Sequence, residues 1–156
     1  MIQRIQTVYL FLTVILCSTS LFSTMGRFFS GTEEIARFGN FGFQSEAVDG
    51  AGPWALGVLL ILVILINLMD IMLFRHLMRQ LRLAIFSTIL LAGYVLTYVA
   101  YVFIYNSQLE SALTQEFRFS LPFMAVLPLL GIILNVMAMH GMRKDEALLR
   151  SAYRLR

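Results

Sequence analysis

The sequence predicts an all-α polytopic membrane protein built as a four-transmembrane-helix bundle. Hydrophobic residues make up 59% of the chain, against roughly 45–50% in soluble globular proteins. Charged residues make up only 13%, about half the usual share, and they gather in the connectors between apolar stretches. A chain of 156 residues fits one domain, so residues 1–156 are expected to form a single membrane domain.

Four apolar stretches define the expected spans, at about residues 5–25, 54–74, 83–105 and 119–140. Each approaches the twenty or so residues that a helix needs to cross about 30 Å of hydrocarbon. Helices are expected because lipid offers the backbone no hydrogen-bond partners. The first span is expected to be retained, because its apolar run is longer than a signal-peptide core and no A-x-A-like site follows it.

Lysine and arginine are distributed unevenly between the two sides of these spans. The N-terminus, the middle connector and the tail together carry nine basic residues, whereas the other two connectors carry only Arg27, Arg37 and Arg118. The positive-inside rule therefore predicts an N-in/C-in topology with both termini in the cytoplasm. The nine residues of this basic cytoplasmic face are Arg4, Arg75, Arg79, Arg82, Arg143, Lys144, Arg150, Arg154 and Arg156.

The first outward connector, residues 26–53, is long for a helix–helix connection and rich in phenylalanine and glycine. We interpret it as an irregular cap over the mouth of the bundle, anchored by phenylalanines at the level of the lipid headgroups. The alternative is a short β-hairpin that turns near Gly39-Asn40 and offers a docking surface outside the membrane. Trp54, directly after Pro53, is typical of an interfacial anchor.

Six polar residues fall at similar depth in the expected spans and form a predicted polar layer, with Asp70 as its one acid. An intramembrane carboxylate normally faces the bundle interior and has a partner, for which Arg4 and His140 are nearest in depth. We interpret the layer as a hydrogen-bonded lock between helices, with a proton or cation site as the alternative. Its members are Asp70, Asn67, Asn135, Gln6, Ser87 and Thr88.

Four tyrosines recur at helical spacing on the third span: Tyr94, Tyr98, Tyr101 and Tyr105. A buried tyrosine hydroxyl needs a hydrogen-bond partner, so this stripe is expected to face other helices or a protein subunit rather than lipid. We interpret it as a helix-packing stripe. A polar or quinone-accepting groove is the alternative.

The last part of the chain is expected to contain a kinked span and a separate short helix. Pro122 suits the opening turn of the fourth span, and Pro128 is expected to kink it near mid-membrane. The tail, residues 141–156, has the pattern of a short amphipathic C-terminal helix with arginines on its polar face. Such a face suits anionic lipid headgroups. A cytoplasmic protein or ribosomal RNA is the alternative partner, and no other nucleic acid is expected.

The sequence offers no residues in a pattern typical of catalysis. The single Cys17 excludes an internal disulfide, and the two histidines, His76 and His140, lack metal-ligand spacing. No phosphate-binding glycine loop or activated nucleophile is present. We therefore expect no enzyme activity, no cofactor and no metal.

The two ends of the chain carry a family resemblance. The opening Met1–Tyr9 and the closing Arg143–Arg156 resemble a family of small four-span inner-membrane proteins from Bacteroidetes, DUF4293, a domain of unknown function. The resemblance implies a location in the bacterial inner membrane and no established activity. It assigns no site residues to this chain.

Without a catalytic pattern, we expect an accessory or scaffold subunit of a larger inner-membrane complex, for example one for protein export or insertion. Its partners would be other membrane subunits and the lipid bilayer. The alternative is a small oligomeric transporter or channel that uses Asp70, Asn67 and Asn135. Heteromeric assembly would distinguish the first hypothesis, and ion flux dependent on Asp70 the second.

Overall fold

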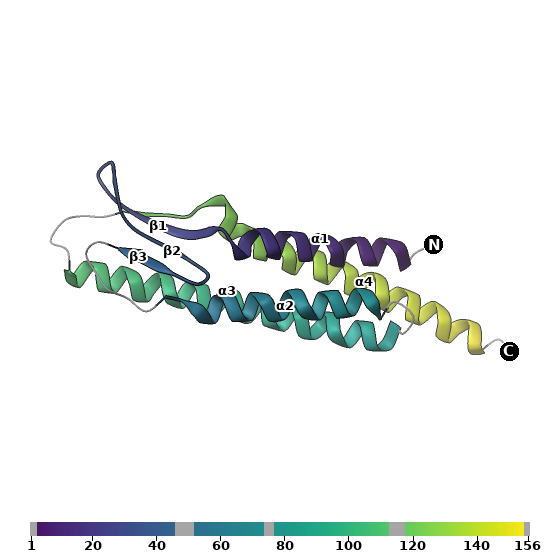
Figure 1. Ribbon diagram of the computed structural model, residues 1–156. Coiled ribbons are helices and arrows are strands. Elements are labelled where there is room, and N and C mark those ends of the chain that lie inside the picture. Colours follow the sequence, from purple (N-terminus) through teal and green to yellow (C-terminus); the bar gives the residue numbers. More distant parts are fainter. Residues whose placement is uncertain (1–2, 46–51, 74–76, 113–117, 155–156) are drawn as a thin grey trace.

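The computed structural model describes residues 3–45, 52–73, 77–112 and 118–154, which form a bundle of four helices with a small sheet at one end (Figure 1). Helix α1 begins and helix α4 ends at the opposite end of the bundle (Figure 1). The order of elements is α1 (Gln3–Leu21), β1 (Thr24–Ser30), β2 (Glu33–Gly39), β3 (Phe43–Ser45), α2 (Trp54–Met72), α3 (Leu77–Ala112), β4 (Arg118–Ser120), the 3₁₀ turn η1 (Phe123–Val126) and α4 (Leu127–Arg154).

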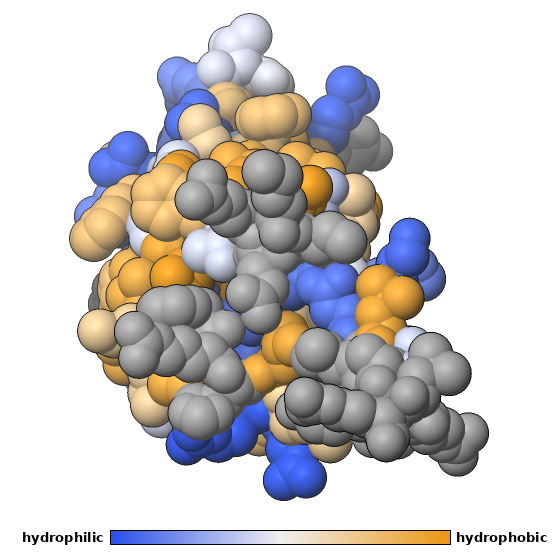
Figure 2. Space-filling model, turned by 90° about the vertical axis from the view of Figure 1, so that its right-hand side faces the viewer, coloured by the Kyte–Doolittle hydropathy of each residue, from blue (hydrophilic) through white to orange (hydrophobic). Residues whose placement is uncertain are grey.

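Three helical segments are long and apolar enough to cross a membrane: Trp54–Met72, Leu77–Ala112 and Phe123–Leu148. The apolar part of α1, Ile5–Leu21, is also helical but is shorter than these three segments. Large apolar side chains point outward from these helices. Figure 2, which faces the end of the bundle where α1 begins and α4 ends, shows orange residues around its outline. An apolar flank of this size suits contact with lipid rather than water.

The helices differ in length from the predicted spans. Helix α1 stops at Leu21, four residues before the predicted end, because the chain turns at Ser23 and enters β1. Helix α3 has 36 residues, which corresponds to about 54 Å and exceeds the roughly 30 Å of a hydrocarbon core. The last part of α3 therefore continues past the length that a membrane needs, and it lies beside the sheet (Figure 1).

The predicted kink in the fourth span is wrong. The tail is helical to Arg154 as predicted, but it continues α4 and does not form a separate helix. Helix α4 begins at Leu127, so Pro128 lies in its first turn, where the missing N–H costs no hydrogen bond. From there α4 runs unbroken to Arg154. Gly141, in the middle of this run, allows α1 and α4 to approach, because a Cβ there would lie 3.1 Å from Cγ of Gln6.

A four-stranded antiparallel sheet replaces the irregular cap, so the all-α prediction is wrong for this part of the chain. The strand order is β3-β2-β1-β4, and β4 comes from the connector between α3 and α4. The β1–β2 hairpin turns at Gly31, whose φ of 63° favours glycine. The residues predicted to form that turn, Gly39 and Asn40, instead lead from β2 to β3.

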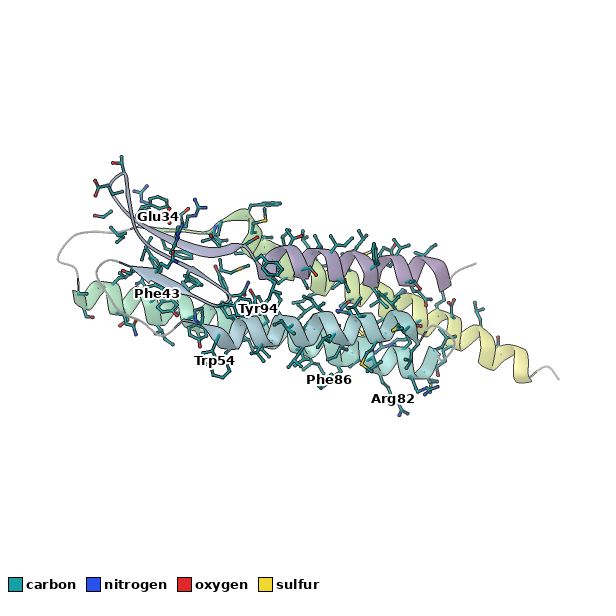
Figure 3. The ribbon with its side chains drawn as sticks, in the orientation of Figure 1. Glu34, Phe43, Trp54, Arg82, Phe86 and Tyr94 are labelled. Carbon is teal, nitrogen blue, oxygen red and sulfur yellow. The ribbon has the colours of Figure 1, made fainter. Side chains whose placement is uncertain are left out.

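The inner face of the sheet packs on the tyrosines of α3. Figure 3 labels Phe43 of the sheet and one of these tyrosines. The rings of Phe43 and Tyr105 are stacked with centroids 4.2 Å apart. Phe38 lies 5.9 Å from the ring of Tyr98 and 5.3 Å from that of Tyr105. The Tyr98 hydroxyl donates a hydrogen bond to the carbonyl oxygen of Met25, at 2.9 Å. The tyrosine stripe is thus the surface on which the sheet is held.

Asn40 connects the sheet to three of the helices. Its Nδ2 donates to the carbonyl oxygens of Ser20 and Leu21, at 2.8 and 3.2 Å, at the end of α1. Its Oδ1 accepts from the Tyr94 hydroxyl of α3 at 2.8 Å, and its carbonyl oxygen accepts from the Gly57 N–H of α2 at 3.1 Å. The side chain therefore satisfies carbonyl groups that a helix end would otherwise leave without donors.

We expect Asn40→Ala to lower the free energy of unfolding by about 1–3 kcal/mol, because it removes a donor to two carbonyl oxygens at the end of α1 and the oxygen acceptor of the Tyr94 hydroxyl. The Ser20 carbonyl keeps the Ser23 N–H as a donor. The Tyr94 hydroxyl keeps only the weak acceptor Met25 Sδ. Thermal unfolding in detergent would measure this loss as a lower midpoint.

The matched control is Asn106→Ala, which removes only an exposed 3.4 Å hydrogen bond to Glu110. Equal midpoints for the two variants would contradict this role of Asn40.

Candidate functional site

Five buried polar residues form a polar layer across the middle of the bundle. An apolar cluster nearer the sheet includes Cys17, Val63 and Leu91, and a second apolar cluster toward the opposite end includes Leu10 and Ala84. Along its own helix, each of the five residues lies between members of these two clusters. On α2, for example, Asn67 and Asp70 fall between Val63 and Ile71. The members of the polar layer are Thr13, Asn67, Asp70, Ser87 and Asn135, and all five are fully buried.

Two residues of the predicted polar layer lie elsewhere or bond differently. Gln6 is buried, but it precedes Leu10 of the second apolar cluster and lies nearer the end of the bundle. Thr88 is half-buried, and its hydroxyl donates to the Ala84 carbonyl oxygen of its own helix at 2.8 Å. Thr13 makes the same kind of hydrogen bond within its own helix, to the carbonyl oxygen four residues earlier at 3.0 Å, so only its full burial distinguishes it from Thr88.

One hydrogen bond between described side chains joins two helices within the polar layer. Asn135 Nδ2 of α4 donates to Ser87 Oγ of α3 at 3.1 Å. Interhelical hydrogen bonds between such side chains contribute about 0.6 kcal/mol on average in membranes. A lock of this size helps to set the register of α3 against α4, but it does not reach Asp70.

Several buried polar atoms of the layer have no hydrogen-bond partner within the described residues. They are both carboxylate oxygens of Asp70, both polar side-chain atoms of Asn67 and Oδ1 of Asn135. Asp70 and Asn67 are three residues apart on one face of α2, so their side chains face the interior together. The arrangement can bind a proton, a cation or water, because it offers oxygen ligands in a place that apolar clusters close on both sides.

Neither predicted partner of Asp70 forms a described contact with it. His140 is exposed on α4, so it does not share the interior with Asp70. The side chain of Arg4 lies outside the described part of the chain.

A second buried polar contact, which sequence reasoning missed, joins the beginning of α1 to the later part of α4. Gln6 Nε2 donates to Asp145 Oδ2 at 2.6 Å, and both side chains are buried. Asp145 was assigned to a separate tail and so was not considered an interior residue. The signal was present, because Asn135, Ala138, Met142 and Asp145 recur at helical spacing and are all buried.

Nine basic residues were predicted to form one face. Those whose side chains are described lie at the end of the bundle opposite the sheet. Figure 3 shows Arg82 near that end and Glu34 at the tip of the sheet. The exposed members are Arg79, Arg82, Arg143 and Lys144. Arg75 and Arg156, and the side chains of Arg4, Arg150 and Arg154, lie outside the described residues.

Among the described residues, no three His, Cys, Asp or Glu side chains lie close enough together to hold a metal ion. Cys17 is a free, buried thiol. His76 lies outside the described residues. Within this part of the chain, the candidate site is therefore the polar layer around Asp70.

A model of the family described as domain of unknown function, DUF4293, matches residues 2–155. The match covers the four helices and the sheet together. A comparison with curated proteins finds no match.

We expect Asp145→Leu to destabilise the bundle by about 1–3 kcal/mol, because Gln6 is left buried without an acceptor. Thermal unfolding in detergent measures the change. Asp145→Asn keeps an acceptor at the same place and should lose less stability. Lys144→Leu, at an exposed neighbouring position, is the control, and a midpoint for Asp145→Leu no lower than that of this control would refute the contribution of the buried contact.

Proposed function

Because the chain belongs to the DUF4293 family, to which no activity is assigned, we propose its function from its geometry. We propose that it is an accessory or scaffold subunit of a larger complex in the bacterial inner membrane, for example one for protein export or insertion. Its four helices cross the membrane with both termini in the cytoplasm, and the sheet lies on the outer side. The charge distribution supports this orientation, because basic residues concentrate at the end opposite the sheet.

The observation that carries the proposal is a closely packed unit that extends from one end of the bundle. We call it the sheet head, consisting of β1–β4 and residues 98–112 of α3. Aromatic packing holds the sheet to α3, and Asn40 ties it to α1 and α2. A unit fixed in this way keeps its surfaces at a constant height and orientation above the bilayer, which suits the docking of a partner.

The outer side of α3 supplies a surface for that partner. Opposite the tyrosine stripe, Val99, Phe103 and Ile104 are exposed, Phe103 by 71%. These residues belong to the part of α3 that runs beside the sheet. Burial of such apolar side chains against a helix of a second membrane subunit would remove them from water, and large aromatic residues are typical anchors of protein interfaces.

We expect a photo-crosslinking amino acid at Phe103 to form one discrete crosslink to a second membrane protein in native membranes. The matched control is the same amino acid at Phe86, an exposed phenylalanine on the part of α3 that is farther from the sheet (Figure 3). It should crosslink mainly to lipid. Extraction in mild detergent should then recover both proteins at a fixed ratio. A chain that migrates alone and gives no protein crosslink from Phe103 would overturn the scaffold proposal.

A second function is favoured by one specific observation, the two carboxylate oxygens of Asp70 that are buried without a described partner. We propose as the alternative that the polar layer conducts a proton or cation. One four-helix chain encloses little space, so this function requires an oligomer. A carboxylate in the middle of apolar surroundings is typical of proton and ion pathways.

If the alternative holds, Asp70→Asn should reduce proton or cation flux into liposomes at least about tenfold, because the amide cannot exchange a proton or neutralise a cation. Glu110→Gln, an exposed carboxylate on the same protein, is the control and should leave the flux unchanged. Absence of flux in the wild-type protein, or equal flux in the two variants, would remove this function. A lower unfolding midpoint with unchanged flux would assign Asp70 to the structure alone.

A further inference from the structure

The three arginines of the connectors on the sheet side lie on one face of the sheet, which we call the arginine face. Arg27 of β1 is directly opposite Arg37 of β2 in the antiparallel register. Arg118 of β4 pairs with Phe29, two residues along β1 from Arg27 and hence on the same face. All three side chains are exposed. Folding of the sheet thus brings Arg118 onto the same face as two arginines from a distant part of the sequence.

No direct ion pair neutralises Arg27 or Arg37 within the described part of the chain. Glu34, which pairs with the same β1 residue as Arg118 does, is the carboxylate on this face, and it lies at the end away from Arg37. Like charges directly opposite each other on paired strands destabilise a sheet. Arg37 Nε donates to Gln44 Oε1 at 2.7 Å, which orients the guanidinium group but brings no negative charge. Among the described residues, no carboxylate lies within 4.0 Å of these guanidinium groups. An anion from outside the chain would supply the missing charge.

A cavity of about 330 Å³ opens beside this face, between the end of α1 and the β2–β3 turn. Its walls include the aromatic rings of Phe22 and Phe41 and the polar side chains of Arg37 and Gln44. Phe22 is 85% exposed, at the point where α1 ends. The cavity therefore joins an apolar rim to the guanidinium group of Arg37, and this combination matches an amphipathic ligand.

The position of the cavity along the bundle corresponds to the headgroup region of a bilayer. Helix α1 ends at Leu21, and α2 begins with the exposed Trp54 at the same end (Figure 3). Tryptophan at a helix end marks the membrane–water interface. Arg37 lies two residues before the end of β2, about 7 Å along the strand, which places its charged group just beyond the apolar rim.

We propose that the arginine face and this cavity bind the phosphate group of an anionic phospholipid from the leaflet on the sheet side. Arg37 and Arg27 would donate bidentate hydrogen bonds to the phosphate oxygens, for which the planar guanidinium group is suited. The acyl chains would lie along Phe22 and Phe41. The apolar rim favours a lipid over a soluble anion. The proposal depends on the position of the sheet at the membrane surface and not on a partner subunit or on flux through the polar layer.

The single tryptophan of the chain, Trp54, provides the probe. It lies one turn from Gly57, at whose position a Cβ would overlap the ring of Phe41 in the wall of the cavity. The full-length protein is placed in phosphatidylcholine vesicles that contain brominated phosphatidylglycerol or, in parallel, brominated phosphatidylcholine. Quenching of Trp54 fluorescence then reports which lipid is enriched beside the cavity.

We expect stronger quenching by brominated phosphatidylglycerol than by brominated phosphatidylcholine in the wild-type protein. Arg27→Gln and Arg37→Gln together should abolish this preference. Each substitution should lower the affinity for phosphatidylglycerol relative to phosphatidylcholine roughly fivefold. Arg79→Gln with Arg82→Gln, two exposed arginines at the opposite end, should leave it unchanged. Because the first pair of substitutions removes facing like charges, its unfolding midpoint should not fall substantially.

Three results would overturn the proposal. One is equal quenching by the two brominated lipids in the wild-type protein. Another is a preference that survives in the doubly substituted Arg27 and Arg37 variant while that variant remains folded. The third is loss of the preference on addition of millimolar inorganic phosphate at constant ionic strength, which would assign the arginine face to a soluble anion instead of a lipid.

Discussion

The amide group of Asn40 is the contact on which the position of the whole sheet depends. Helix α1 ends next to the sheet, and its last carbonyl groups need donors in a place that the sheet covers. Asn40 supplies them from the β2–β3 connection and also accepts from Tyr94 of α3. Since its own backbone carbonyl binds Gly57 of α2, one residue fixes the sheet against three helices at once.

The two ends of the bundle are held together by different chemistry. At the sheet end, stacked aromatic rings and the amide of Asn40 set the geometry. At the opposite end, the close approach of α1 and α4 at Gly141 brings Gln6 onto Asp145. Between them, the polar layer contains buried atoms without described partners. The most firmly connected parts of the fold thus enclose the buried polar atoms that have no described partner.

The sequence predicted what depends on local composition and missed what depends on pairing between distant segments. Apolar length identified α2 almost to the residue, and depth along the spans brought Asn67, Asp70, Ser87 and Asn135 to one level. The sequence predicted only a short hairpin as an alternative, with its turn misplaced at Gly39-Asn40, because register shifts in β1 and β2 interrupt the alternation of their side chains. Strand β4 has three residues, too few for any pattern. Asp145 was missed because a helix that continues beyond the membrane length looks, in sequence, like a span followed by a tail.

The place of β4 in the chain has a consequence for the order of events during synthesis. Strands β1, β2 and β3 are made before α2, but β4, which pairs with β1, follows α3. Until Ser120 has emerged and α3 has been inserted, β1 remains an open edge with unpaired backbone groups. Completion of the sheet is therefore a late step that waits for most of the chain. A product truncated before β4 would carry that exposed edge, which marks it as a substrate for proteases and for aggregation.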